Sequence, residues 1–139
     1  MITLEDKIAI SELVARFAHC SDFGDWKTLA TLYAPEVETE MEGIELRFRG
    51  IDDQIEHAKV SDRNTEGKNR HYNYNLFIAE EGGEVVAHYM FTNVNAGHTP
   101  MGAQIVVSGR MRDTVVKIDG AWKIARRLVR FDQNVAVTE

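Results

Sequence analysis

Hydrophobic positions in the first third of the chain follow a helical period. Apolar residues over 10–17 recur at i, i+3, i+4 and i+7, which is typical of the buried face of an amphipathic helix. A capping-box pattern at residues 3–6 predicts where this helix begins. The same apolar spacing over 26–33 predicts a second helix, with Asp25 as its N-cap and Pro35 as its stop.

Beyond Pro35 the period changes to two. Apolar residues alternate with charged residues over 37–42 and again over 44–49, so we predict a hairpin with one side in solvent. Four further strands, separated by loops and glycine-containing turns, are predicted at 71–79, 84–95, 103–118 and 122–131.

Between the hairpin and these strands lies a short amphipathic segment. Its spacing predicts a third helix over 51–58, in which His57 beside Glu56 is interpreted as a surface pair. The following segment, 61–70, is almost wholly polar and predicts a mobile loop.

The order of these elements predicts an α+β fold in a single domain, residues 1–139. Three helices interrupted by a hairpin, followed by a four-strand meander, indicate a curved, mostly antiparallel sheet wrapped around the N-terminal helices. Such a half-barrel encloses a cavity where the strands and helices diverge, and small ligands usually bind in cavities of this kind.

Composition narrows the range of partners. The 139 residues are 44% hydrophobic and 27% charged, a globular balance, and the net charge of −6 argues against nucleic acid or an anionic membrane as partner. One cysteine, Cys20, excludes an internal disulfide and a cysteine-based metal cluster. With no signal peptide and no apolar run of membrane-spanning length, we expect a cytoplasmic protein.

Asp22 is the first candidate for chemistry. It lies at the break between the two predicted helices, where the C-terminal end of the helix dipole disfavours a negative charge. A carboxylate kept at such a place can serve in acid–base catalysis. A solvated turn residue, or an N-cap for the second helix, explains the same position equally simply.

Four segments together resemble a known family. Residues 21–26 read Ser-Asp-Phe-Gly-Asp-Trp, 48–50 read Phe-Arg-Gly, 70–71 read Arg-His, and 117–124 read Lys-Ile-Asp-Gly-Ala-Trp-Lys-Ile. The chain resembles the SnoaL-like branch of the nuclear transport factor 2-like superfamily, whose fold is a cone-shaped α+β barrel. That superfamily includes dehydratases, isomerases, cyclases, epoxide hydrolases, oxygenase small subunits and proteins without chemistry.

The resemblance implies roles for two residues. In scytalone dehydratase and the bile-acid dehydratases, an aspartate after the first helix and a histidine at the start of the strand after the third helix form a catalytic pair. Asp22 and His71 fall on these positions. The tyrosines that those dehydratases also use are replaced here by Phe17 or Ser21 and by Met41.

Other polar side chains are candidates for substrate binding. Alternation along a strand puts positions 73 and 75 on the face of His71. A second histidine of scytalone dehydratase falls near Asn95, and His19 lies one helical turn before Asp22. Arginines of the last two strands are expected to pair with the Glu-rich hairpin or lie at a subunit interface, and one of them could instead bind an acidic substrate group. The full set of candidates is His19, Tyr33, Asn73, Asn75, Tyr89, Asn95 and Arg127.

The sequence therefore predicts a cofactor-free lyase or isomerase without a metal ion. Asp22 and His71 move a proton on a small hydrophobic substrate, aromatic or polycyclic, with loss of water or another small fragment such as formaldehyde. His19, Asp22 and His71 match no metal motif in their spacing. The family commonly associates through the outer face of the sheet, so we expect a homodimer or homotrimer. The alternative is a non-catalytic ligand-binding or assembly domain, such as an oxygenase small subunit.

Overall fold

The computed structural model describes residues 1–97 and 101–134. Helix α1 spans Leu4–Phe23, and the predicted capping box is present, with the Thr3 hydroxyl and the Asp6 carboxylate each accepting from the other residue's backbone N–H. The apolar face predicted over 10–17 is buried. The helix ends at Gly24, which has the left-handed conformation (φ 74°) that glycine adopts without steric cost.

Helix α2 is shorter than predicted. It spans Trp26–Thr31 and is capped by Asp25 as expected, but strand β1 (Tyr33–Glu42) begins two residues later. Tyr33 is already paired with Ile124 in the sheet, so tertiary pairing ends the helix before Pro35 does. Pro35 lies within β1, in the stretch where the register shifts, so the ladder does not need its missing N–H.

The hairpin is confirmed, and the loop predicted after the third helix is wrong in part. Strand β2 (Leu46–Arg49) pairs with β1, and helix α3 spans Gly50–Asn64. The polar residues 61–64 form the last turn of α3 rather than a loop. Thr65 ends the helix, and its hydroxyl donates to the carbonyl of Ser61 at 2.8 Å. A last helix turn that is partly in solvent needs few apolar residues, so polarity alone did not distinguish it from a loop.

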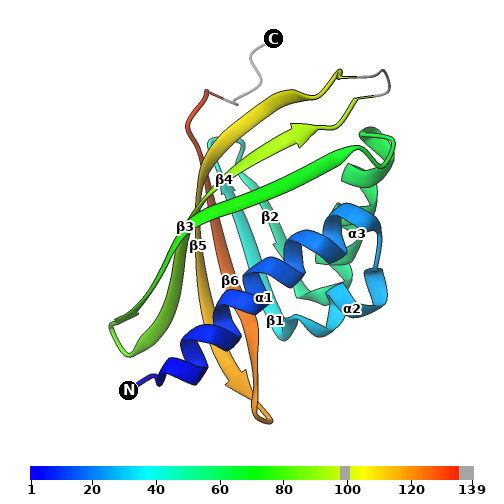
Figure 1. Ribbon diagram of the computed structural model, residues 1–139. Coiled ribbons are helices and arrows are strands. Elements are labelled where there is room, and N and C mark those ends of the chain that lie inside the picture. The colour runs from blue at the N-terminus through cyan, green and yellow to red at the C-terminus, as the bar shows by residue number, and fades with distance from the viewer. Residues whose placement is uncertain (98–100, 135–139) are drawn as a thin grey trace.

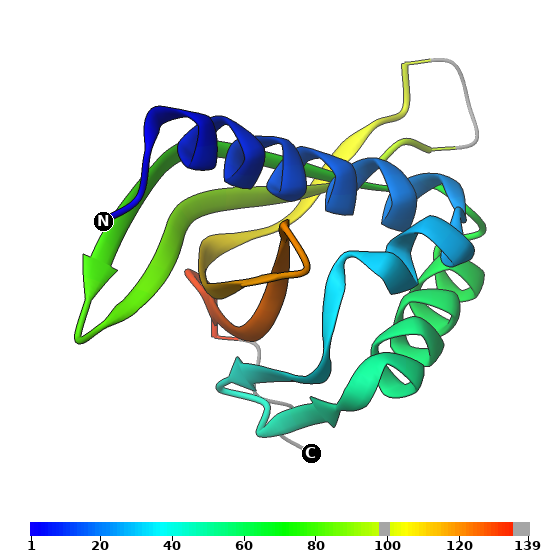
Figure 2. The ribbon, with the colours of Figure 1, turned by 90° about the horizontal axis from the view of Figure 1, so that it is seen from below.

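The remaining strands complete a six-stranded sheet. They are β3 (Asn69–Glu81), β4 (Glu84–Asn95), β5 (Gln104–Ile118) and β6 (Ala121–Phe131). The order is β2-β1-β6-β5-β4-β3, and every neighbouring pair is antiparallel except β1–β6. The sheet curves strongly but does not close, and the helices cover its concave side (Figures 1 and 2). This confirms the predicted α+β architecture.

The core lies between the helices and this concave face. Its fully buried side chains come from α1, α2, β1, β4 and β6, and they include Ile10, Leu29, Val37, Phe91 and Ile124. Helix α1 packs mainly on β3, and α3 packs on β1 and β2. The two helices therefore cover opposite ends of the sheet, and a cavity lies between them. No helix in the described part of the chain is long and apolar enough to cross a membrane.

Candidate functional site

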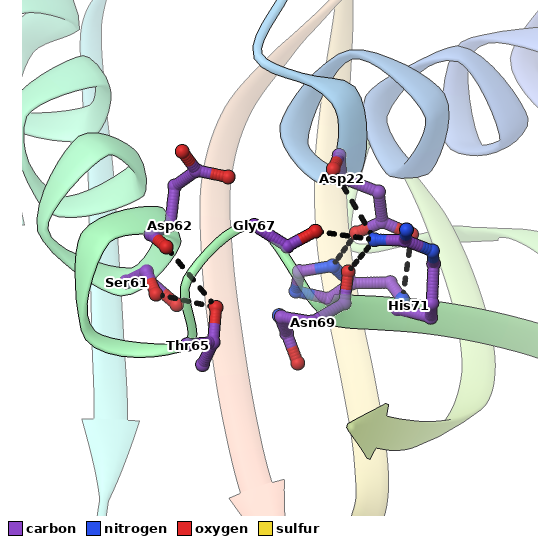
Figure 3. A network of polar contacts seen from close by, with 8 residues as sticks. Asp22, Ser61, Asp62, Thr65, Gly67, Asn69 and His71 are labelled. Carbon is purple, nitrogen blue, oxygen red and sulfur yellow. Dashed lines mark hydrogen bonds and ion pairs between the residues drawn. The ribbon is translucent and has the colours of Figure 1, made fainter. Parts of the chain in front are cut away.

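Asp22 and His71 are hydrogen-bonded to each other at the junction of α1 and β3 (Figure 3). Asp22 Oδ1 lies 2.5 Å from His71 Nδ1, and Asp22 Oδ2 accepts the backbone N–H of His71 at 2.8 Å. Only 6% of the aspartate side chain and 14% of the histidine side chain are exposed. One carboxylate therefore binds both the ring and the main chain of the histidine, which fixes the orientation of the imidazole.

Arg70 holds the two elements together beside this pair. Its Nη1 donates to the carbonyls of Asn69 at 2.7 Å and Gly67 at 3.0 Å, with a longer contact of 3.5 Å to the carbonyl of Asp22. Its guanidinium also lies 4.5 Å from the centre of the Phe23 ring. The end of α1 is thereby tied to the start of β3, so the spacing between Asp22 and His71 is set by structure rather than by two free side chains.

His71 lines a cavity of about 110 Å³ under the concave face of the sheet. The Phe17 ring contacts the imidazole edge-on, with ring centres 5.6 Å apart. Most of the wall is apolar, and it includes Phe17, Met41, Phe91, Met111, Val129 and Phe131. An apolar cavity of roughly 150 Å³ is known to accept benzene, so this one is on the scale of a single ring.

A buried ion pair forms another part of the wall. Arg127 donates to Asp113 through Nε and Nη2, both at 2.8 Å, and Nη2 also lies 3.0 Å from the Tyr89 hydroxyl. Tyr89 in turn donates to Asp113 at 2.7 Å, and the guanidinium lies 3.8 Å from the centre of the Phe17 ring. Burial opposes the charge of Arg127, but Asp113 together with Tyr89 and Tyr33 outweighs it, so the pKa of the guanidinium is raised.

This pairing changes the expected role of Arg127. Because Asp113 neutralises its charge, the arginine offers the cavity a hydrogen-bond donor rather than a free cation. No acceptor among the described residues is bonded to Nη1 of Arg127. Tyr33 also lines the cavity, its hydroxyl has no partner in the described chain, and burial raises the pKa of Tyr33 to about 12. Both groups therefore remain donors at neutral pH.

His57 is a cavity residue that the sequence interpretation placed wrongly on the surface. Gln54, His57, Ala58 and Ser61 all line the cavity, at i, i+3, i+4 and i+7 of α3. The helical spacing of these four residues is visible in the sequence, but three of them are polar. The prediction instead used the apolar residues of the same helix to choose its buried face.

A β-bulge explains the position of Asn75. The register of β3 against β4 shifts between Tyr74 and Phe77, and Asn75 has a positive φ of 56°. The extra residue reverses the alternation, so Asn75 and Phe77 are exposed while Leu76 packs on the core. The predicted shared face of positions 71, 73 and 75 therefore ends at Asn73.

The other predicted binding residues lie outside the cavity wall. His19 is exposed on α1, in an outer groove between α1 and β3. Asn95 accepts the backbone N–H of Gly97 at 2.8 Å near the end of β4. Tyr89 lies behind Arg127, with its hydroxyl used in the buried network. Of the nine predicted site residues, Tyr33, His71 and Arg127 line the cavity, and Asp22 is bonded to His71. His19, Asn73 and Tyr89 lie instead along the outer groove, which His71 also lines.

Two asparagines beside His71 carry buried polar atoms without partners. Asn93 faces His71 across β3 and β4 and lines the cavity, and its Oδ1 is unpaired among the described residues. Asn73, two residues along β3 from His71, leaves both Oδ1 and Nδ2 unpaired in that part of the chain. Buried polar atoms are nearly always hydrogen-bonded, so these amides can bind a polar group of a ligand. Asn93 was not predicted from the sequence.

Other arginines of β5 and β6 form ion pairs with glutamates. Arg130 pairs with Glu42 of the hairpin at 2.7 Å, as expected. Arg112 and Arg126 pair instead with Glu81 and Glu84 beside the β3–β4 turn, both at 3.1 Å. Within residues 1–97 and 101–134, no three histidine, cysteine, aspartate or glutamate side chains converge as a metal site.

Comparisons with known proteins agree with this architecture. A family model described as a SnoaL-like domain matches residues 3–128. No curated protein shows significant sequence similarity to the chain. Aln2 from a Streptomyces species is similar in structure, with a TM-score of 0.84, 19% identity, and coverage of 95% of this chain and 94% of Aln2.

Two structures from Novosphingobium aromaticivorans are similar as well. One, provisionally assigned as a scytalone dehydratase, has a TM-score of 0.77 at 23% identity, with coverage of 97% of this chain and 91% of that one. The other is the β subunit of a provisionally assigned aromatic-ring-hydroxylating dioxygenase, with a TM-score of 0.70 at 17% identity and coverage of 90% and 88%. At these identities the likeness shows the fold alone.

Proposed function

The chain belongs to the SnoaL-like domain family, and from that premise we propose that it is a cofactor-independent lyase or isomerase. Its substrate is a small cyclic, largely apolar molecule that carries at least one oxygen. The reaction is removal and return of a proton next to a carbonyl, with elimination of water or another small fragment such as formaldehyde. The observation that carries the proposal is the buried Asp22–His71 pair at the edge of the cavity.

The geometry supports a division of labour within the pair. With Nδ1–H of His71 directed at Asp22, the lone pair of Nε2 is left to accept a proton. The carboxylate then stabilises the imidazolium that forms, as the orienting acid does in a catalytic triad. The imidazolium can return its proton to a leaving hydroxyl, so one residue serves as base and then as acid.

The rest of the wall supports binding of a neutral substrate. Arg127 and Tyr33 offer one donor each, and the carbonyl oxygen of Asn93 offers an acceptor. Since Asp113 already balances Arg127, a substrate carboxylate would gain no unpaired positive charge here. Tyr33 and Arg127 are suited to hold the substrate oxygen in place of the tyrosines that related dehydratases use.

A substrate screen with two variants tests this function. The screen would use single-ring β-hydroxy ketones and hydroxymethyl phenols, with loss of water or formaldehyde as readout. We expect His71→Ala to lower kcat by about 10²–10⁴, the usual scale of acid–base catalysis, and Asp22→Asn to impair it severely. The matched control is His88→Ala, because His88 also pairs with a carboxylate, Glu81 at 2.7 Å, but outside the cavity. Full activity in both His71→Ala and Asp22→Asn would refute the proposal.

A second candidate is a non-catalytic domain such as an oxygenase small subunit. It is favoured by the structural likeness to a dioxygenase β subunit, which shows that the same architecture occurs in such a protein. A ligand that binds in the cavity and is never converted, in the presence of a copurifying large subunit, would favour this alternative.

We also propose that the chain forms a homodimer or homotrimer. The outer face of the sheet exposes large apolar side chains, including Tyr72, Phe77 and Met90. Exposed apolar side chains gathered on one face are typical of interaction sites. Light scattering at micromolar concentration is expected to give a multiple of the 15.8 kDa monomer mass. A monomer mass would exclude this assembly.

A further inference from the structure

The cavity contains a second histidine that the acid–base pair does not explain. His57 lies on α3, on the wall supplied by that helix, whereas His71 comes from β3. We propose that His57 is a further catalytic residue: a neutral imidazole that donates a hydrogen bond to the substrate oxygen while His71 transfers the proton. This inference rests on the proposed function.

The position of His57 is fixed by its neighbours. The ring packs on Phe48 of β2, with ring centres 4.1 Å apart. Gln54, one turn earlier, accepts the Thr39 hydroxyl at 2.7 Å and donates to the carbonyl of Phe48 at 3.3 Å. Helix α3 is thus anchored to the β1–β2 hairpin beside the histidine, and the imidazole is held without using its own nitrogens.

The ring nitrogens of His57 have no hydrogen-bond partner among the described residues. His71 and His88 each pair with a carboxylate, but the His57 ring has no hydrogen bond or ion pair with any of the described residues. The buried polar side-chain atoms without partners belong to Asn73 and Asn93, so the His57 nitrogens are accessible to solvent or ligand. A preorganised donor of this kind needs no rearrangement when it meets an oxygen.

The surroundings give the two histidines different chemistry. Burial lowers the pKa of His57, and a positive charge on His71 lowers it further whenever His71 is protonated. A neutral imidazole keeps one N–H donor and can polarise an oxygen, a role known for a histidine in triosephosphate isomerase. His71, by contrast, has its Nδ1 held by the Asp22 carboxylate at 2.5 Å. The other basic side chains that line the cavity are already partnered, His71 by Asp22 and Arg127 by Asp113.

Binding of 4-nitrophenol tests this role without a known substrate. The phenolate oxygen mimics an oxygen on which charge develops, and absorbance reports both its dissociation constant and its ionisation. His57→Phe keeps the ring on Phe48 and removes the nitrogens, and His57→Gln restores a donor. We expect His57→Phe to weaken phenolate binding about tenfold, as for loss of a hydrogen bond to a charged group, and His57→Gln to stay within about threefold of wild type.

The matched control is His88→Phe, because His88 also stacks on a phenylalanine, Phe77 at 4.7 Å, but on the outer face. It should bind 4-nitrophenol as wild type does, with all variants showing the wild-type circular dichroism. A loss smaller than about threefold in His57→Phe, an equal loss in His57→Gln, or no binding by the wild type would overturn the proposal. If His71→Ala and Asp22→Asn both retain full turnover, the proposed lyase mechanism fails, and the 4-nitrophenol comparison still decides whether His57 donates to a bound oxygen.

Discussion

Replacing Asp113 by asparagine removes one negative charge from a network that the fold has sealed from solvent. The aspartate is 0% exposed and Arg127 is 4% exposed. In the variant, Arg127 keeps its position and its charge but faces a neutral amide. Either the Nε–H or the Nη2–H of the arginine then meets an NH₂ group, which cannot accept a hydrogen bond.

The expected cost follows from this geometry. Breaking a buried ion pair by changing one partner costs about 3–5 kcal/mol, because the other charge stays buried and uncompensated. Asparagine fills the volume of aspartate and keeps one oxygen, so we expect the lower end, about 3 kcal/mol. For a domain of this size that corresponds to a fall in Tm of roughly 10 °C.

Urea and thermal unfolding followed by circular dichroism measure this change in the free energy of unfolding. The control is Glu84→Gln, which breaks the exposed Arg126–Glu84 pair at 3.1 Å and should cost less than about 1 kcal/mol. Combining Asp113→Leu with Arg127→Met should cost less than the sum of the single changes, since neither charge is then left alone. If Asp113→Asn destabilises the protein no more than Glu84→Gln does, the buried Arg127–Asp113 pair does not stabilise the fold as inferred.

Three shorter predictions concern other parts of the chain. Gly109→Ala should lower the free energy of unfolding by about 1–3 kcal/mol or more, since its Cβ would lie 2.1 Å from a backbone oxygen and 2.8 Å from the Phe91 ring; wild-type urea unfolding would contradict this. Burial raises the pKa of Cys20, so the native thiol should react with a disulfide reagent far more slowly than the unfolded chain; equal rates would refute it. Hydrogen bonds from the Thr3 backbone and the Trp122 indole lower the pKa of Asp6, so the ionised Asp6 stabilises the fold above its unfolded pKa of about 3.9 and this stabilisation is lost as pH falls below that value. The difference in Tm between wild type and Trp122→Phe should therefore shrink at low pH. A difference in Tm that stays constant with pH would contradict this.

Much of the fold was predictable because local signals agree with the tertiary structure. The capping box at Thr3, the apolar face of α1 and the change of period after the helices are each set by neighbours in sequence, and all were confirmed. The end of α2 was not, because the pairing of Tyr33 with a strand some ninety residues later decides it.

The site divides in the same way. Asp22 and His71 could be proposed from the sequence because their positions match a known pattern, whereas neither residue alone identifies a site. His57 was missed because a polar stripe on a helix usually faces solvent, whereas α3 packs on β1 and β2 with this stripe against the cavity. Asn75 was misplaced by a single inserted residue, and the partner of Arg127 depends on the β5–β6 register, which also contains a shift.

The strand order has a consequence for how the molecule assembles. Strand β6 is the last described strand in sequence, yet it lies in the middle of the sheet, between β1 and β5. Until it has emerged during synthesis, the β1–β2 hairpin and the β3–β5 meander have no partner in common and cannot join into one sheet. Contacts this far apart in sequence slow folding, and the waiting strand edges are exposed to aggregation. The Asp22–His71 pair needs only α1 and β3, so the two residues can meet before β6 has completed the wall of the cavity beside them.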